Sequence, residues 1–146
     1  MNAPITAPQH RETAMRFMLM MSGTQSNFQT FGTMSMDDLK AHVGFMKRFN
    51  EDLKKAGTFV AAEGLDISPT YTRIVRATKR GAPSVVDGPF AETKEFLAGY
   101  WIVKVANLDE AIAIAARASA APGAGGEPIN IPIEVRLVAE APPVEA

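Results

Sequence analysis

Apolar residues recur along this chain with two different periods, and each period predicts one kind of element. Short apolar or alternating runs predict strands at 16–21, 58–63, 71–78, 98–105 and 131–138, with a shorter strand at 84–86. Spacing of three and four residues predicts two amphipathic helices between them. A polar loop, 22–34, joins the first strand to the first helix.

Both helices carry clear start signals. Ser35 is expected to cap the first and Gly57 to end it, and its apolar stripe is Leu39, Val43, Met46, Phe49 and Leu53. Asn107 is expected to cap the second, with Glu110 three residues later. The buried face of this second helix is predicted to consist of Leu108, Ala111, Ile112, Ala115 and Ala118.

The order of these elements is that of a βαββαβ chain with extra pieces, which is the ferredoxin-like α+β arrangement. Such a chain places both helices on one face of an antiparallel sheet. The other face stays uncovered, and large exposed apolar surfaces are typical of interfaces. We therefore expect a homodimer in which two sheets pack face to face.

Composition narrows the classes of function. The chain has 146 residues, a formal charge of −1 and no cysteine. One domain is expected over 15–138, with a flexible segment at 1–14 and a disordered tail at 139–146. The chain lacks a basic stripe, which argues against binding to nucleic acid. Its longest apolar run is too short to span a membrane. We therefore expect a cytoplasmic protein that binds neither a metal ion nor a cofactor.

The stretch 87–95, DGPFAETKE, is the most distinctive in the chain. Asp87 has two interpretations: it shapes its own turn before Gly88, or it is a catalytic base at the mouth of a pocket. Glu92, Lys94 and Glu95 are expected in a helical turn, either solvated or lining the same pocket, with Lys94 best placed to hold an anion.

This stretch, with Gly99, Tyr100 and the later segments DEA (109–111) and EVRLV (134–138), resembles the YCII-related family in its DGPF branch. The resemblance covers roughly 15–138 and implies the dimeric α+β barrel, a dimer of ferredoxin-like units. Some members of that family have a proposed His–Asp dyad, and one relative is a dehydrochlorinase. The end of the first strand carries Ser22 where those members place their histidine, so the dyad is not carried over intact.

Two further residues are candidates for ligand contact. Arg76 points inward as an anion clamp or outward into water, depending on which face of its strand is covered. Ser22 takes the position of the family's histidine. His42 is expected to be a boundary residue of the first helix rather than a base.

Two classes of function follow. The first is a cofactor-free enzyme or binder that performs proton transfer on a small aromatic or lactone-like ligand, with Asp87 as base. The second is a non-catalytic interaction module linked to transcription-related partners, because related domains occur beside sigma-like factors.

Overall fold

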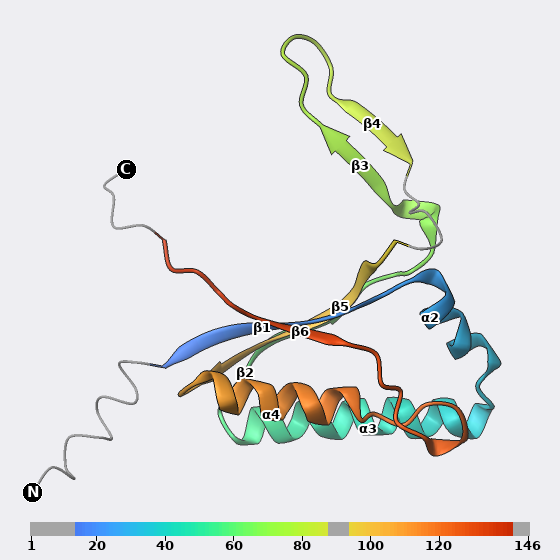
Figure 1. Ribbon diagram of the computed structural model, residues 1–146, viewed down its shortest axis with the longest axis vertical. Helices are drawn as coiled ribbons and strands as arrows, with labels where there is room; N and C mark the ends of the chain where they lie inside the picture. Colours follow the sequence, from blue (N-terminus) through green and yellow to red (C-terminus); the bar gives the residue numbers. More distant parts are fainter. Residues whose placement is uncertain (1–13, 88–93, 142–146) are drawn as a thin grey trace, which may run out of the picture.

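The computed structural model describes residues 14–87 and 94–141, and its centre is a four-stranded antiparallel sheet (Figure 1). The strand order is β2-β5-β1-β6, which is the ferredoxin-like order once the two strands of an inserted hairpin are set aside. The sheet strands are β1 (Met15–Gly23), β2 (Phe59–Gly64), β5 (Phe96–Val105) and β6 (Ile133–Leu137). The predicted α+β, ferredoxin-like fold is confirmed.

Two long helices lie on the same face of this sheet, α3 (Met36–Lys55) and α4 (Leu108–Ser119). Their predicted caps are present: the Ser35 hydroxyl accepts from the Asp38 amide at 3.0 Å, and the Asn107 side chain accepts from the Glu110 amide at 2.9 Å. Gly57 follows α3 with φ of 73°, a conformation that glycine adopts without strain.

The hydrophobic core fills the space between the sheet and the two helices. Phe17 and Leu19 of β1 and Val103 of β5 face it from the sheet, and all are buried. Phe49 of α3 is 2% exposed and meets the Trp101 ring edge-on, with ring centroids 5.6 Å apart. The alanines of α4 bring this helix close to the sheet, because small side chains allow close packing.

One predicted sheet strand is placed differently. The stretch 71–78 does not join the four-stranded sheet: β3 (Arg73–Arg76) pairs with β4 (Ser84–Asp87) in a separate two-stranded hairpin, which we call the arm. Gly81 has φ of 87° in the connection, which lets the chain fold straight back on itself. The arm rises from one end of the sheet, on the side away from the helices (Figure 1).

Smaller corrections concern exposure and element ends. Val43 is 48% exposed although the stripe of α3 predicts it buried, and Leu108 and Ile112 of α4 are also 48% exposed. The buried residues are Phe49 and Leu53 in α3 and Ala111, Ala115 and Ala118 in α4. The predicted loop 22–34 contains the short helix α2 (Gln25–Gln29) and a 3₁₀ turn, η2 (Thr30–Thr33), and β5 begins at Phe96 rather than at residue 98.

Two further 3₁₀ turns are present, η3 (Pro69–Tyr71) before the arm and η4 (Ala124–Gly126) after α4. Most of the predicted flexible segment 1–14 and of the predicted tail 139–146 lies outside the described residues, which include only 14 and 139–141 of these two stretches. Within the described part of the chain, none of the helices has both the length and the apolar character that a membrane crossing requires.

Candidate functional site

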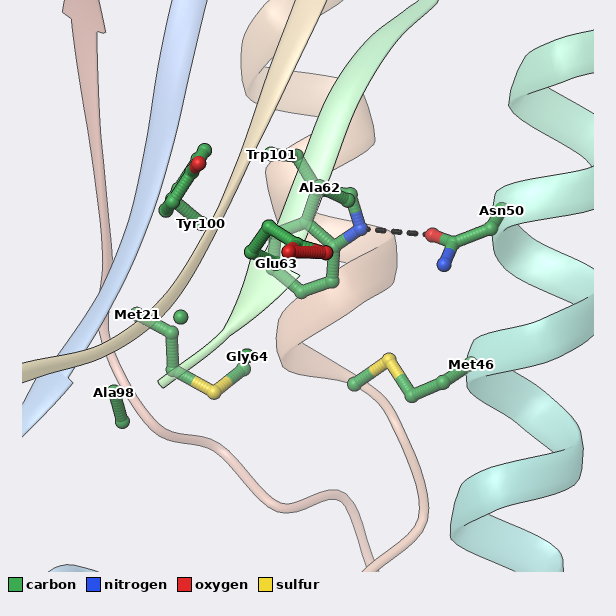
Figure 2. Close-up of a pocket in the computed structure, with 10 residues that line it drawn as sticks. Met21, Met46, Asn50, Ala62, Glu63, Gly64, Ala98, Tyr100 and Trp101 are labelled. Carbon is green, nitrogen blue, oxygen red and sulfur yellow. Dashed lines mark hydrogen bonds between the residues drawn. The ribbon is translucent and has the colours of Figure 1, made fainter. Parts of the chain in front are cut away.

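A cavity of about 380 Å³ lies where α3 faces β2 and β5 (Figure 2). Its walls are mostly apolar, and its polar groups are few, which is the usual character of a small-molecule site. The lining residues come from β1, α3, β2 and β5: Met21, Met46, Asn50, Ala62, Glu63, Gly64, Ala98, Gly99, Tyr100 and Trp101.

Glycine lets the two strands beside the cavity approach each other. A Cβ added to Gly99 would lie 3.2 Å from the carbonyl oxygen of Glu63 and 3.6 Å from the Cα of Gly64, its partner across the strands. A larger residue at position 99 would therefore push β2 away from β5. The missing side chains at 64 and 99 also leave space at this end of the cavity.

The orientation of the Asn50 amide follows from its partner. The indole Nε1–H of Trp101 donates to Asn50 Oδ1 at 2.9 Å (Figure 2). Because an indole nitrogen only donates, the atom that faces it must be the amide oxygen. The Asn50 NH₂ group is thereby directed away from Trp101, toward the side of Met46. The cavity thus gains two N–H donors held in a fixed direction.

Glu63 supplies the carboxylate among the lining residues of this cavity. It lies on β2, the edge strand, opposite Tyr100, and it is exposed. Cross-strand partners point to the same side of the sheet, so its carboxylate lies on the side of Tyr100, while the Asn50 amide donors on α3 can hold a carbonyl oxygen. Met21 and Met46 add flexible apolar walls that adapt to different ligand shapes.

A second cavity, of about 500 Å³, lies between the root of the arm and the start of β5. Glu95 lines it together with Asp66, Tyr71 and neighbouring apolar residues. Ser22 pairs with Leu97, another lining residue of this cavity, so the structure brings Ser22 and Glu95 to the same end of the sheet. Lys94 comes just before β5 and is exposed. Glu92 is outside the described residues.

Asp87 and Arg76 are on the arm, Asp87 at its root and Arg76 further along it. Asp87 pairs with Arg73 across the two strands, with Asp87 Oδ1 3.2 Å from Arg73 Nε. Arg76 lies opposite Ser84 near the far end of the arm and is exposed. The described cavities do not include either residue in their lining. The predicted helical turn at 92–95 is not helical at the two positions described, 94 and 95.

Replacing Asp87 with asparagine is expected to change the free energy of unfolding by less than about 1 kcal/mol. The carboxylate of Asp87 is 82% exposed and its arginine partner 46%, so water screens the pair. Urea denaturation of the two proteins measures the difference. Glu134→Gln, which removes a similarly exposed partner of Arg136, is the matched control. A loss well above 1 kcal/mol for Asp87→Asn alone would show that the arm depends on this pair.

A signal for Asn50 is present in the sequence. Asn50 comes four residues after Met46 on α3, so it lies beside the apolar stripe and faces the sheet. A polar residue at such a position usually has a buried partner, here the single tryptophan. Glu63 carries no comparable signal, because an acidic residue near the end of an edge strand is ordinary.

Comparison with known proteins places the chain in a family. The sequence model of the YCII-related domain matches residues 15–128, from the first residue of β1 to just after η4. The chain belongs to the YCII-related family. The resemblance predicted from the DGPF stretch is thereby confirmed at the level of the YCII-related family.

A similar protein carries no functional description in its name. An uncharacterized protein of Rhizobium meliloti (strain 1021) is 46% identical over 44 residues, which is 30% of this chain. The chain covers 36% of the length of that relative. The described residues hold no group of three or more His, Cys, Asp or Glu side chains that could bind a metal ion.

Proposed function

We propose that this chain binds a small, largely apolar carbonyl compound in the cavity between α3 and the sheet. The observation that carries the proposal is the bond from Trp101 to Asn50, because it turns the Asn50 N–H donors toward the cavity. The cavity of about 380 Å³ suits a one- or two-ring aromatic or lactone-like ligand.

Binding needs one pair of donors and apolar walls. The Asn50 N–H groups donate to the carbonyl oxygen of the ligand, and Met21, Met46 and the Trp101 ring cover its apolar part.

Asn50→Asp is expected to weaken binding of 2-coumaranone by about tenfold or more. This compound, called coumaranone below, is a bicyclic aromatic lactone. The aspartate keeps an oxygen for the Trp101 indole but removes both N–H donors, and an unmade hydrogen bond to a buried ligand group costs about 1–3 kcal/mol. The fluorescence of Trp101, the only tryptophan in the chain, reports occupancy in the titration. Equal affinity of the two proteins for coumaranone would contradict this role of Asn50.

We also propose that the chain forms a homodimer through the face of the sheet opposite the helices, which we call the open face. No helix or strand among the described residues covers it (Figure 1). Its centre is apolar and half-buried, formed by Met18 and Met20 of β1 beside Tyr100 and Ile102 of β5. A second sheet at about 10 Å would cover these side chains.

Charges on the open face favour one orientation of the two sheets. Arg16 and Lys104 lie directly opposite each other at the end where β1 begins, and like charges in that position repel. Glu63 and Glu134 lie two rows of residues away, level with Tyr100 and Met20. A two-fold axis across the strands places the acidic part of each sheet over the basic end of the other.

A further inference from the structure

The arm exposes apolar residues that a two-stranded hairpin cannot cover. Val75 and Val85 are cross-strand partners and are 60% and 56% exposed, and Val86 on the other face is 50% exposed. β3 and β4 pack on each other and on little else among the described elements. An isolated two-stranded ribbon is at best marginally stable in water, so the arm gains from a surface to pack on.

A complementary apolar surface lies at the opposite end of the sheet. Leu108, the first residue of α4, is 48% exposed, and Leu137, the last residue of β6, is 55% exposed. Both lie at the end where β1 begins, because Leu137 pairs with Phe17 and α4 starts just after β5 ends. The arm leaves from the other end, so it does not reach this surface within its own copy (Figure 1).

Charge favours the same pairing. Lys79 and Arg80 lie in the connection at the tip of the arm, and both are exposed. Asp109 and Glu110 lie in the first turn of α4, next to Leu108. Opposite charges at the rim of an apolar contact set its register and exclude other arrangements.

The proposed dimer brings these surfaces together. With the two-fold axis across the strands, the end of the partner's sheet that carries Leu108 and Leu137 stands above the root of the arm. At ~3.3 Å per residue, the chain from Arg73 to Lys79 can span at most ~20 Å. The second sheet lies only ~10 Å from the first, so the arm is long enough to pass it and reach the start of α4.

We infer that the arm of each copy packs against the Leu108–Leu137 end of a second copy, with its basic tip at the acidic first turn of α4. This inference rests on the proposed homodimer and is independent of the ligand cavity. The partner is a second copy of this chain, since the arm and the surface that it fits are both present on the same molecule.

Cross-linking between cysteine variants tests the contact without background, because the natural chain has no cysteine. Full-length Val85→Cys protein with an affinity tag is mixed with untagged Leu137→Cys protein and treated with a short bismaleimide. We expect a covalent product of two chains in at least about tenfold higher yield than from Val85→Cys mixed with Val43→Cys, a residue of α3 with similar exposure. Circular dichroism confirms that each variant is folded.

Adding Lys79→Glu to the Val85→Cys chain should lower the yield severalfold, because the tip then repels Asp109. Equal yields from the two mixtures, with sedimentation showing a dimer, would overturn the arm contact and leave the dimer intact. Sedimentation as a monomer would overturn both. Neither result bears on coumaranone binding, which the fluorescence of Trp101 measures separately.

Discussion

Replacing Met20 with lysine is expected to turn the dimer into folded monomers. Met20 lies at the centre of the open face, between Tyr100 on one neighbouring strand and Glu134 on the other. In the monomer the new ammonium group is in water beside Glu134, so the fold tolerates it. In the dimer it would be buried under the second sheet, and two-fold symmetry would bury two such groups.

The size of the effect follows from the cost of burying an ammonium group that lacks a full set of partners. That cost is several kcal/mol per ion, and about 4 kcal/mol corresponds to a thousandfold rise in the dissociation constant. Sedimentation velocity over a range of concentrations measures it. Met36→Lys is the matched control, because Met36 is 66% exposed on α3 and lies in the helix layer. If both variants stay dimeric at the concentrations where wild type is a dimer, the open face is not the interface.

Phe49→Ala is expected to destabilise the chain by about 3–5 kcal/mol. The ring is 2% exposed, meets Trp101 edge-on and stacks on Phe45 at a centroid distance of 5.9 Å. Arg117 of α4 also lies over it, 5.1 Å from the ring centroid. Removing the ring leaves a void between both helices and the sheet, which the surrounding side chains fill only in part.

Urea denaturation gives the difference in the free energy of unfolding. Val43→Ala, on the same helix but 48% exposed, should cost less than about 1 kcal/mol, because little buried surface is lost. A loss below about 1.5 kcal/mol for Phe49→Ala would mean that Phe49 is not central to the packing of α3 on the sheet. The paired variants separate burial from helix propensity, since both end in alanine on α3.

Local sequence signals predicted the frame of the fold well. Ser35 and Asn107 cap their helices as expected, because an N-cap depends on the few residues around it. The alternation in 98–105 predicted a strand, and β5 is the strand that joins β2 to β1. These features depend on periods of two and of three to four residues, which a single sequence displays directly.

The pairing of strands that are distant along the chain was harder to predict from the sequence. The pattern of 71–78 predicts a strand of the main sheet. In the structure Val75 pairs with Val85 in the arm, because a turn at Gly81 favours the partner strand that is nearer along the chain. Leu108 and Ile112 fit the apolar face that the sequence predicts for α4. In the folded structure, both side chains are exposed. Apolar period alone does not tell a core from a surface that a second molecule covers.

The candidate site shows the same limit. Asp87 is a candidate base in the sequence because it begins a distinctive stretch. In the structure it pairs with Arg73 on the exposed arm. Asn50 is an ordinary residue in the sequence, and its importance comes from Trp101, which lies 51 positions away along the chain. A site built from α3, β2 and β5 becomes visible only when the sheet brings the three together.

The most direct test of the proposed function is the titration of wild-type protein with coumaranone and with coumaran, the cyclic ether that lacks the carbonyl group. Trp101 fluorescence reports both from inside the cavity. The Asn50 donors predict saturable binding of coumaranone and at least about tenfold weaker binding of coumaran. No response to coumaranone, or equal affinity for the two compounds, would contradict a carbonyl-binding site at Asn50.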